Sequence, residues 1–115
     1  MTIIEEILTA AGVLHRQGRF PKPPAETYAV YFDDVEVDAA DRVPLPVGLR
    51  LPRIYHHSGR VEVYEPTPDD KTEAAIEAEF DARGIPWSKE DRYWLQDVQR
   101  YQVLYNCNYT DKRRN

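Results

Sequence analysis

The chain has 115 residues, with 15 basic residues against 20 acidic ones and a formal net charge of −5 at neutral pH. This balance disfavours proteins that bind nucleic acid or anionic membranes by general charge attraction. The hydrophobic content of 42% and the eight tyrosines are typical of a globular protein, so we expect one domain over residues 1–115.

The first predicted element is a helix over residues 3–16. Its apolar residues recur at three- and four-residue intervals, the pattern of a helix with one buried stripe. Thr2 and Glu5 have the spacing of a capping box at the start, and Gly18 suits a left-handed exit at the end. Prolines then keep residues 19–26 extended, and an alternating, aromatic run predicts a strand over about 27–38.

Residues 39–52 are rich in proline and also alternate in aliphatic residues. Because proline is excluded from central strands, we expect an edge hairpin or an arm, whose aliphatic row needs a cover. That cover is either a neighbouring subunit or this domain's own core. The residues expected at such an interface are Arg42, Val43, Leu45, Val47, Leu49 and Arg50.

The second half of the chain predicts a strand over about 53–65, with Ser58 and Gly59 as a possible bend, and a helix over about 68–83 with Thr67 as its N-cap. Two strands follow, over about 86–96 and 99–110, and residues 111–115 form a flexible tail. The order predicts an α+β fold, with an antiparallel or mixed sheet of four or more strands and both helices on one face.

Few residues in the sequence suggest catalysis or the binding of a metal or cofactor. His56 and His57 are adjacent on a predicted strand and therefore point to opposite faces, so we expect no metal site, and rim or surface positions for both. Cys107 lies on the apolar side of the last strand, where a buried thiol is commoner than a reactive one. With no phosphate loop, nucleophile elbow or paired cysteine ligands in the sequence, we expect no cofactor and no enzymatic activity.

A single cysteine excludes an intrachain disulfide and favours a reducing compartment. The sequence shows neither the pattern of a secretion signal nor about 18 consecutive apolar residues, so we expect a soluble protein without membrane contact.

An acidic group gathers around the first strand and comprises Asp33, Asp34, Asp38 and Asp41. A solvated acidic edge is the simplest interpretation. The alternative is a functional negative surface, such as one that repels nucleic acid from a channel wall.

Four stretches, Thr27–Tyr31, Val61–Pro66, Ala82–Trp87 and Gln99–Val103, resemble small tail proteins of tailed bacteriophages and prophages, in particular tail terminator or tail completion proteins. The resemblance implies a hexameric ring that caps the tail tube and docks to the head connector, while DNA passes through without specific binding. It also implies a place in the virion tail, after assembly in the cytoplasm of a bacterial host.

On this resemblance, residues 39–52 are an arm that contacts a neighbour or the tube, and Arg42 and Arg50 pair with Asp33 and Asp34 across a subunit boundary. Two other functions stay open. One is a head–tail connector or stopper, and the other is a small adaptor or ligand-binding domain that uses the tyrosine-rich sheet face or the two tryptophans.

Overall fold

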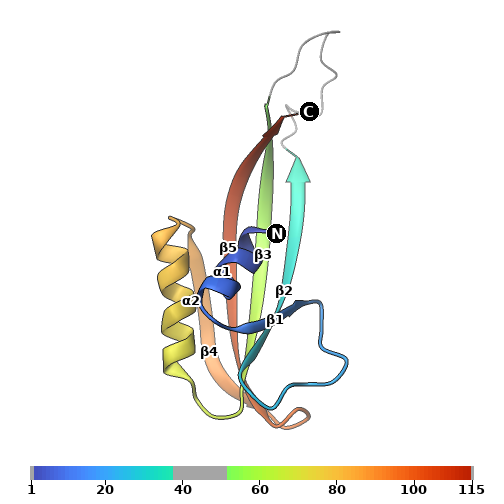
Figure 1. The fold of residues 1–115 in the computed structure, drawn as a ribbon, viewed down its shortest axis with the longest axis vertical. Coiled ribbons are helices and arrows are strands. Elements are labelled where there is room, and N and C mark those ends of the chain that lie inside the picture. The colour runs from blue at the N-terminus through green and yellow to red at the C-terminus, as the bar shows by residue number, and fades with distance from the viewer. Residues whose placement is uncertain (1, 38–51, 115) are drawn as a thin grey trace.

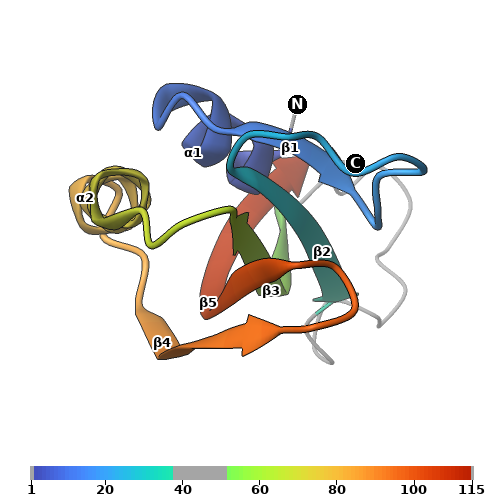
Figure 2. The same cartoon turned by 90° about the horizontal axis from the view of Figure 1, so that it is seen from below.

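The computed structural model describes residues 2–37 and 52–114, and within them it contains five strands and two helices. The elements are α1 (Ile3–Ala10), β1 (Leu14–Gln17), β2 (Tyr28–Val37), β3 (Pro52–Glu65), α2 (Asp70–Ala82), β4 (Trp87–Leu95) and β5 (Arg100–Arg114). The sheet is mixed and curled, and both helices cover its concave side (Figure 2). The predicted α+β fold is therefore confirmed.

The strand order is β1-β2-β3-β5-β4. β1 pairs with β2 in parallel, and every other neighbouring pair is antiparallel. The three central strands are the longest and continue past both helices and both outer strands (Figure 1). We define the extension as residues 32–37 of β2, 52–60 of β3 and 108–114 of β5; at its near end, Gly59 still lies beneath α1.

α1 begins as predicted but ends earlier. The Thr2 side chain accepts a hydrogen bond from the Glu5 N–H at 3.2 Å, which caps the first turn. At the other end, Gly12 has a φ of 76°, its N–H donates to the Thr9 carbonyl, and the Val13 N–H donates to the Leu8 carbonyl. This pair of bonds is a Schellman motif, and it ends the helix.

The prediction that the first helix continues to residue 16 is therefore wrong. Residues 14–17 form β1, and Leu14 lies opposite Tyr28 in a parallel pairing with β2. The Gly18 N–H donates to the Tyr31 carbonyl at 3.1 Å and so belongs to the end of this short strand rather than to a helix exit.

α2 starts two residues later than predicted and uses a different cap. The Asp69 carboxylate accepts from the Thr72 N–H at 3.0 Å and from the Thr72 hydroxyl at 2.7 Å. Thr27, at the entrance to β2, donates to the same carboxylate at 2.7 Å. Asp69, and not Thr67, is therefore the N-cap of α2. A carboxylate accepts hydrogen bonds from several donors at once, and the bond from Thr27 also ties the helix to the sheet.

The core lies between the helices and the concave side of the sheet. Its fully buried members come from both helices and from β2, β3 and β5, and include Ile4, Ile7, Leu8, Ala29, Val61, Val63, Ile76, Phe80, Val103 and Tyr105. Gly59 lies inside β3 and forms no bend. An added Cβ there would be 2.6 Å from Ile4 Cδ1 and 2.8 Å from Cys107 Sγ, so glycine lets α1 rest directly on the sheet.

The end of the chain also departs from the prediction. β5 continues to Arg114, and its pairing with β3 ends at Arg114 opposite Pro52, so residues 111–114 are strand and not a tail. Pro52 is the first residue of β3, a position that proline tolerates because no earlier ladder bond is lost. The rest of the predicted arm, residues 39–51, lies outside the described residues.

The two helices have 8 and 13 residues. Within the described part of the chain, neither helix has the length and apolar character needed to cross a membrane.

Candidate functional site

Most of the residues predicted at a contact surface lie outside the described part of the chain. These are Asp38, Asp41, Arg42, Val43, Leu45, Val47, Leu49 and Arg50. Asp33 and Asp34 are described, and they point to opposite faces of β2. The Asp33 side chain is 8% exposed on the concave side, whereas Asp34 is exposed on the other side. They therefore do not form one acidic surface.

Asp33 belongs instead to a buried polar cluster built around His57. The His57 Nδ1 lies 3.0 Å from Asp33 Oδ2, and its Nε2 lies 3.1 Å from Asp111 Oδ2. The Tyr109 hydroxyl donates to Asp33 Oδ2 at 3.0 Å, and its ring stacks on the imidazole with centroids 4.4 Å apart. Three strands thus meet in one cluster, to which we refer as the His57 cluster.

The contacts of His57 explain why it can be buried. Each of its ring nitrogens lies within hydrogen-bond distance of a carboxyl oxygen, at 3.0 Å for Asp33 and 3.1 Å for Asp111. The His57 side chain is only 4% exposed, and a buried polar group is costly without partners, so both contacts matter. The expectation that this histidine is a rim or surface residue is wrong, since the carboxylates of Asp33 and Asp111 allow its burial.

Two hollows adjoin the His57 cluster, one on each side of the N-terminus of α1. The first measures ≈ 520 Å³ and lies between Ile3, the residues after α2, and β5. The second measures ≈ 450 Å³ and is lined by Glu5, Tyr31, Asp33 and Val35 among others. Both hollows are open to solvent. The inner side of the extension is therefore accessible on either side of the buried His57.

The described residues give little support for catalysis by a nucleophile or a metal. Burial raises the pKa of the Cys107 thiol to about 11, which keeps it protonated at neutral pH, as its position on the apolar side of the strand predicts. Burial, followed by the hydrogen bond to Asp33, raises the pKa of Tyr109. No group of three or more histidine, cysteine or carboxylate side chains that could hold a metal ion occurs within residues 2–37 and 52–114.

A second polar cluster, which the sequence did not reveal, joins β3, α2 and β4. Glu65 is fully buried and accepts from the Asp69 N–H at 3.2 Å. Arg92 lies 3.2 Å from Glu65 Oε1 and 2.6 Å from Glu73 Oε2, and Lys89 lies 2.8 Å from Glu73 Oε1. Neither carboxylate lines the two hollows beside His57, and the cluster fixes α2 to the sheet.

The two carboxyls of this cluster titrate differently. Burial, followed by a hydrogen bond to Glu73, raises the pKa of Glu65 to about 8. The pKa of Glu73 is lowered: its own burial opposes this, and hydrogen bonds from Glu65, Lys89 and Arg92 outweigh that burial. Glu65 therefore holds a proton at neutral pH and Glu73 carries the negative charge.

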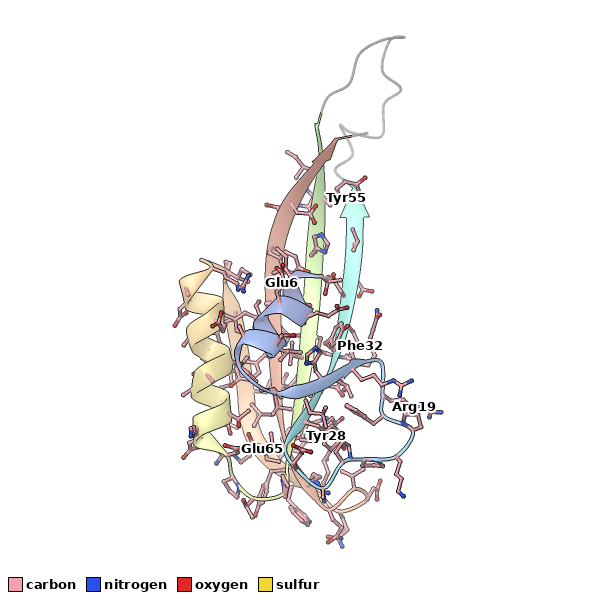
Figure 3. All side chains as sticks on the ribbon, in the orientation of Figure 1. Glu6, Arg19, Tyr28, Phe32, Tyr55 and Glu65 are labelled. Carbon is pink, nitrogen blue, oxygen red and sulfur yellow. The ribbon has the colours of Figure 1, made fainter. Side chains whose placement is uncertain are left out.

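The extension is open to solvent on both of its sides near its far end. Val35 is 49% exposed on its inner side, and Tyr55, labelled in Figure 3, lies near its far end, opposite the end of β3 that carries Glu65. The outer side is polar, with Asp34, Ser58 and Asn108 level with one another across the three strands. Within residues 2–37 and 52–114, the far part of the extension is a three-stranded ribbon that no helix covers (Figure 1).

Sequence reasoning missed the residues that organise this region. His57, Tyr109 and Asp111 come from strands that are adjacent only in the folded sheet, and the sequence signal that could have found them is the shared alternation of inward-facing positions on β3 and β5.

Comparison with solved structures finds several chains of similar fold. A chain in the structure of the virion of a native gene transfer agent particle is similar to this chain, with 15% sequence identity and a TM-score of 0.48, over 91% of this chain and 84% of that chain. No model of a known protein family matches, and no curated protein matches. A likeness of this extent says nothing about function.

Proposed function

We propose that the chain is a structural component of a tailed virus particle or of a particle derived from one. In this proposal it acts as a tail terminator, a ring that caps the tail tube and docks it to the head connector. The observation that supports the proposal most strongly is the extension, in which three long strands leave the core and no helix of the described chain covers their far ends (Figure 1).

The architecture suits such a role because it separates the contact surface, on the extension, from the rest of the described fold, which we call the body. The body has a fully buried core and two polar clusters that tie the helices and strands together. The His57 cluster lies where the extension leaves the body, so it holds β2, β3 and β5 in a fixed relation. A ring component needs this combination, since a contact surface that is already ordered loses less entropy on assembly.

The charge of the chain agrees with a passage for DNA that does not bind it. Each copy has a formal charge of −5, so a ring of several copies is strongly acidic overall and has no general affinity for a phosphate backbone.

Sedimentation velocity tests the proposal. The full chain is run at rising concentration, alone and together with purified tail tubes from a tailed phage of the same host. We expect closed oligomers in at least one of these conditions, and co-sedimentation with the tube ends. A chain that stays monomeric in every condition and does not associate with tubes contradicts the proposal.

A second function, a small adaptor or ligand-binding domain, is favoured by one observation, the two hollows of ≈ 520 Å³ and ≈ 450 Å³ beside His57. The same sedimentation experiment separates the two functions, because this alternative predicts a monomer at all concentrations.

A further inference from the structure

Two strand edges of the extension have no neighbouring strand within the described residues. On one side, β1 pairs with β2 only from Tyr28 to Tyr31, and the Gly18 N–H bond to Tyr31 closes that pairing. The following residues of β2, 32–37, have β3 on one side and no described strand on the other. An edge of this kind presents backbone N–H and C=O groups that can pair with another strand.

The opposite edge of the extension belongs to β5. β4 reaches β5 as far as Trp87, which lies opposite Cys107, and the Asn108 N–H donates to the Pro86 carbonyl at 3.3 Å. Beyond this bond, residues 109–114 of β5 have β3 on one side and no other strand in the described part. The two edges have the same length, six residues each.

The outer strands of the body differ from these edges. β4 carries the charged run Lys89–Arg92 and a register shift between Glu90 and Tyr93, features that discourage pairing with a further strand. β1 has only four residues. Strand addition is therefore expected at the extension and not at the edges of the body.

The charges of the two extension edges are complementary. The β2 edge carries the exposed Asp34 and Glu36 on its outer side and no basic residue, while Asp33 is buried against His57. On the β5 edge Asp111 also contacts His57, and the last three residues of β5 in the described chain, 112–114, are all basic. Two β2 edges repel each other, and so do the ends of two β5 edges. A β2 edge beside a β5 edge brings opposite charges together.

We propose that the β2 edge of one copy pairs with the β5 edge of a second copy, so that the extensions form one continuous sheet around the ring. This inference deepens the proposed function and rests on its ring. Because β2 and β5 both run antiparallel to β3, they point in the same direction, and the new junction is parallel. The contact joins two different surfaces, which lets it repeat around a closed axis.

The register of the sheet limits how the copies are staggered. Asp34 is level with Asn108, while Lys112 lies four positions further along β5. A shift by an even number of residues keeps inner positions beside inner positions. Shifts of two and four residues place Asp34 beside Thr110 and Lys112, and closed sheets require such a stagger.

Paired cysteines test the contact in the full chain. Asp34→Cys is combined in turn with Thr110→Cys, Lys112→Cys and, for zero stagger, Asn108→Cys. Within one copy β3 separates the two strands, so their Cα atoms are about 10 Å apart, beyond the roughly 7 Å limit for a disulfide. Any disulfide between the two sites therefore joins two copies. Asp34→Cys with Ala78→Cys, an exposed position on α2, is the matched control.

We expect mild oxidation to convert most of the chain into a ladder of two and more linked copies for the Thr110 or the Lys112 pair, and not for the Ala78 control. Oligomers in sedimentation without a ladder for any pair overturn the edge pairing and leave the ring intact. A chain that remains monomeric, alone and with tubes, overturns both.

Charge reversal gives a second measurement that does not depend on disulfide geometry. Asp34→Lys and Lys112→Asp should each shift the equilibrium toward monomer, and the two together should restore assembly. Additive losses in the double variant contradict the pairing.

Discussion

Gly59 offers a sharp test of how α1 rests on the sheet. Gly59→Ala adds a Cβ that would lie 2.6 Å from Ile4 Cδ1 and 2.8 Å from Cys107 Sγ, distances well inside van der Waals contact. Overfilling of a packed core costs about 1–3 kcal/mol, a large part of the roughly 5–15 kcal/mol by which a domain of this kind is stable. Urea unfolding should show a lower midpoint with an unchanged slope.

A double-mutant cycle identifies the contact. Ile4→Val removes the Cδ1 atom, and on its own this costs about 0.5–1.5 kcal/mol. The remaining Cγ1 is 3.6 Å from the added Cβ, an ordinary contact, so the double variant should lose clearly less than the sum of the two single losses. Ser58→Ala, at the exposed neighbouring position, is the control and should change stability little. Additive losses, or a Gly59→Ala variant as stable as the parent, would refute this account of the packing.

Three further changes test other parts of the structure. Glu65 has its pKa raised to about 8, so its favourable contribution is fully present below its ordinary pKa of 4.5 and is lost as pH rises from there to 8; Glu65→Gln should remove that loss and gain roughly 4 kcal/mol over the parent at pH 9 relative to pH 5, from about 1.4 kcal/mol for each of three pH units, measured by urea unfolding. Gly12→Ala should cost about 1 kcal/mol because φ is positive there, and Gly12→Asn less, as thermal unfolding will show. His57→Phe should cost roughly 3 kcal/mol by leaving Asp33 and Asp111 without the hydrogen-bond partner that they share; unchanged stability contradicts the role of the cluster.

The sequence predicts the elements well where local chemistry determines them. The Thr2 cap and the alternation of Val103, Tyr105 and Cys107 needed no long-range information, and the structure confirms them. The first helix was predicted too long because two glycines, Gly12 and Gly18, both suit a helix end. The earlier one forms the Schellman motif because β1 then pairs with β2, a contact that no local pattern indicates.

The polar clusters depend on burial, which sequence patterns indicate poorly for charged residues. Asp33 and His57 are 24 positions apart, and His57 and Asp111 are 54 apart, so only the sheet register brings them together. Glu65 ends a strand and reads as a solvent-facing charge, yet it is fully buried beneath Arg92. Each of these residues is buried because its partner comes from another strand or helix.

The account as a whole depends on copies of this chain meeting through their extensions. Electron microscopy of the full chain, alone at high concentration and bound to purified tail tubes, tests this most directly. We predict closed rings in which neighbouring copies share a sheet across β2 and β5. Rings whose copies touch only through the helices, or single copies in both preparations, would contradict it.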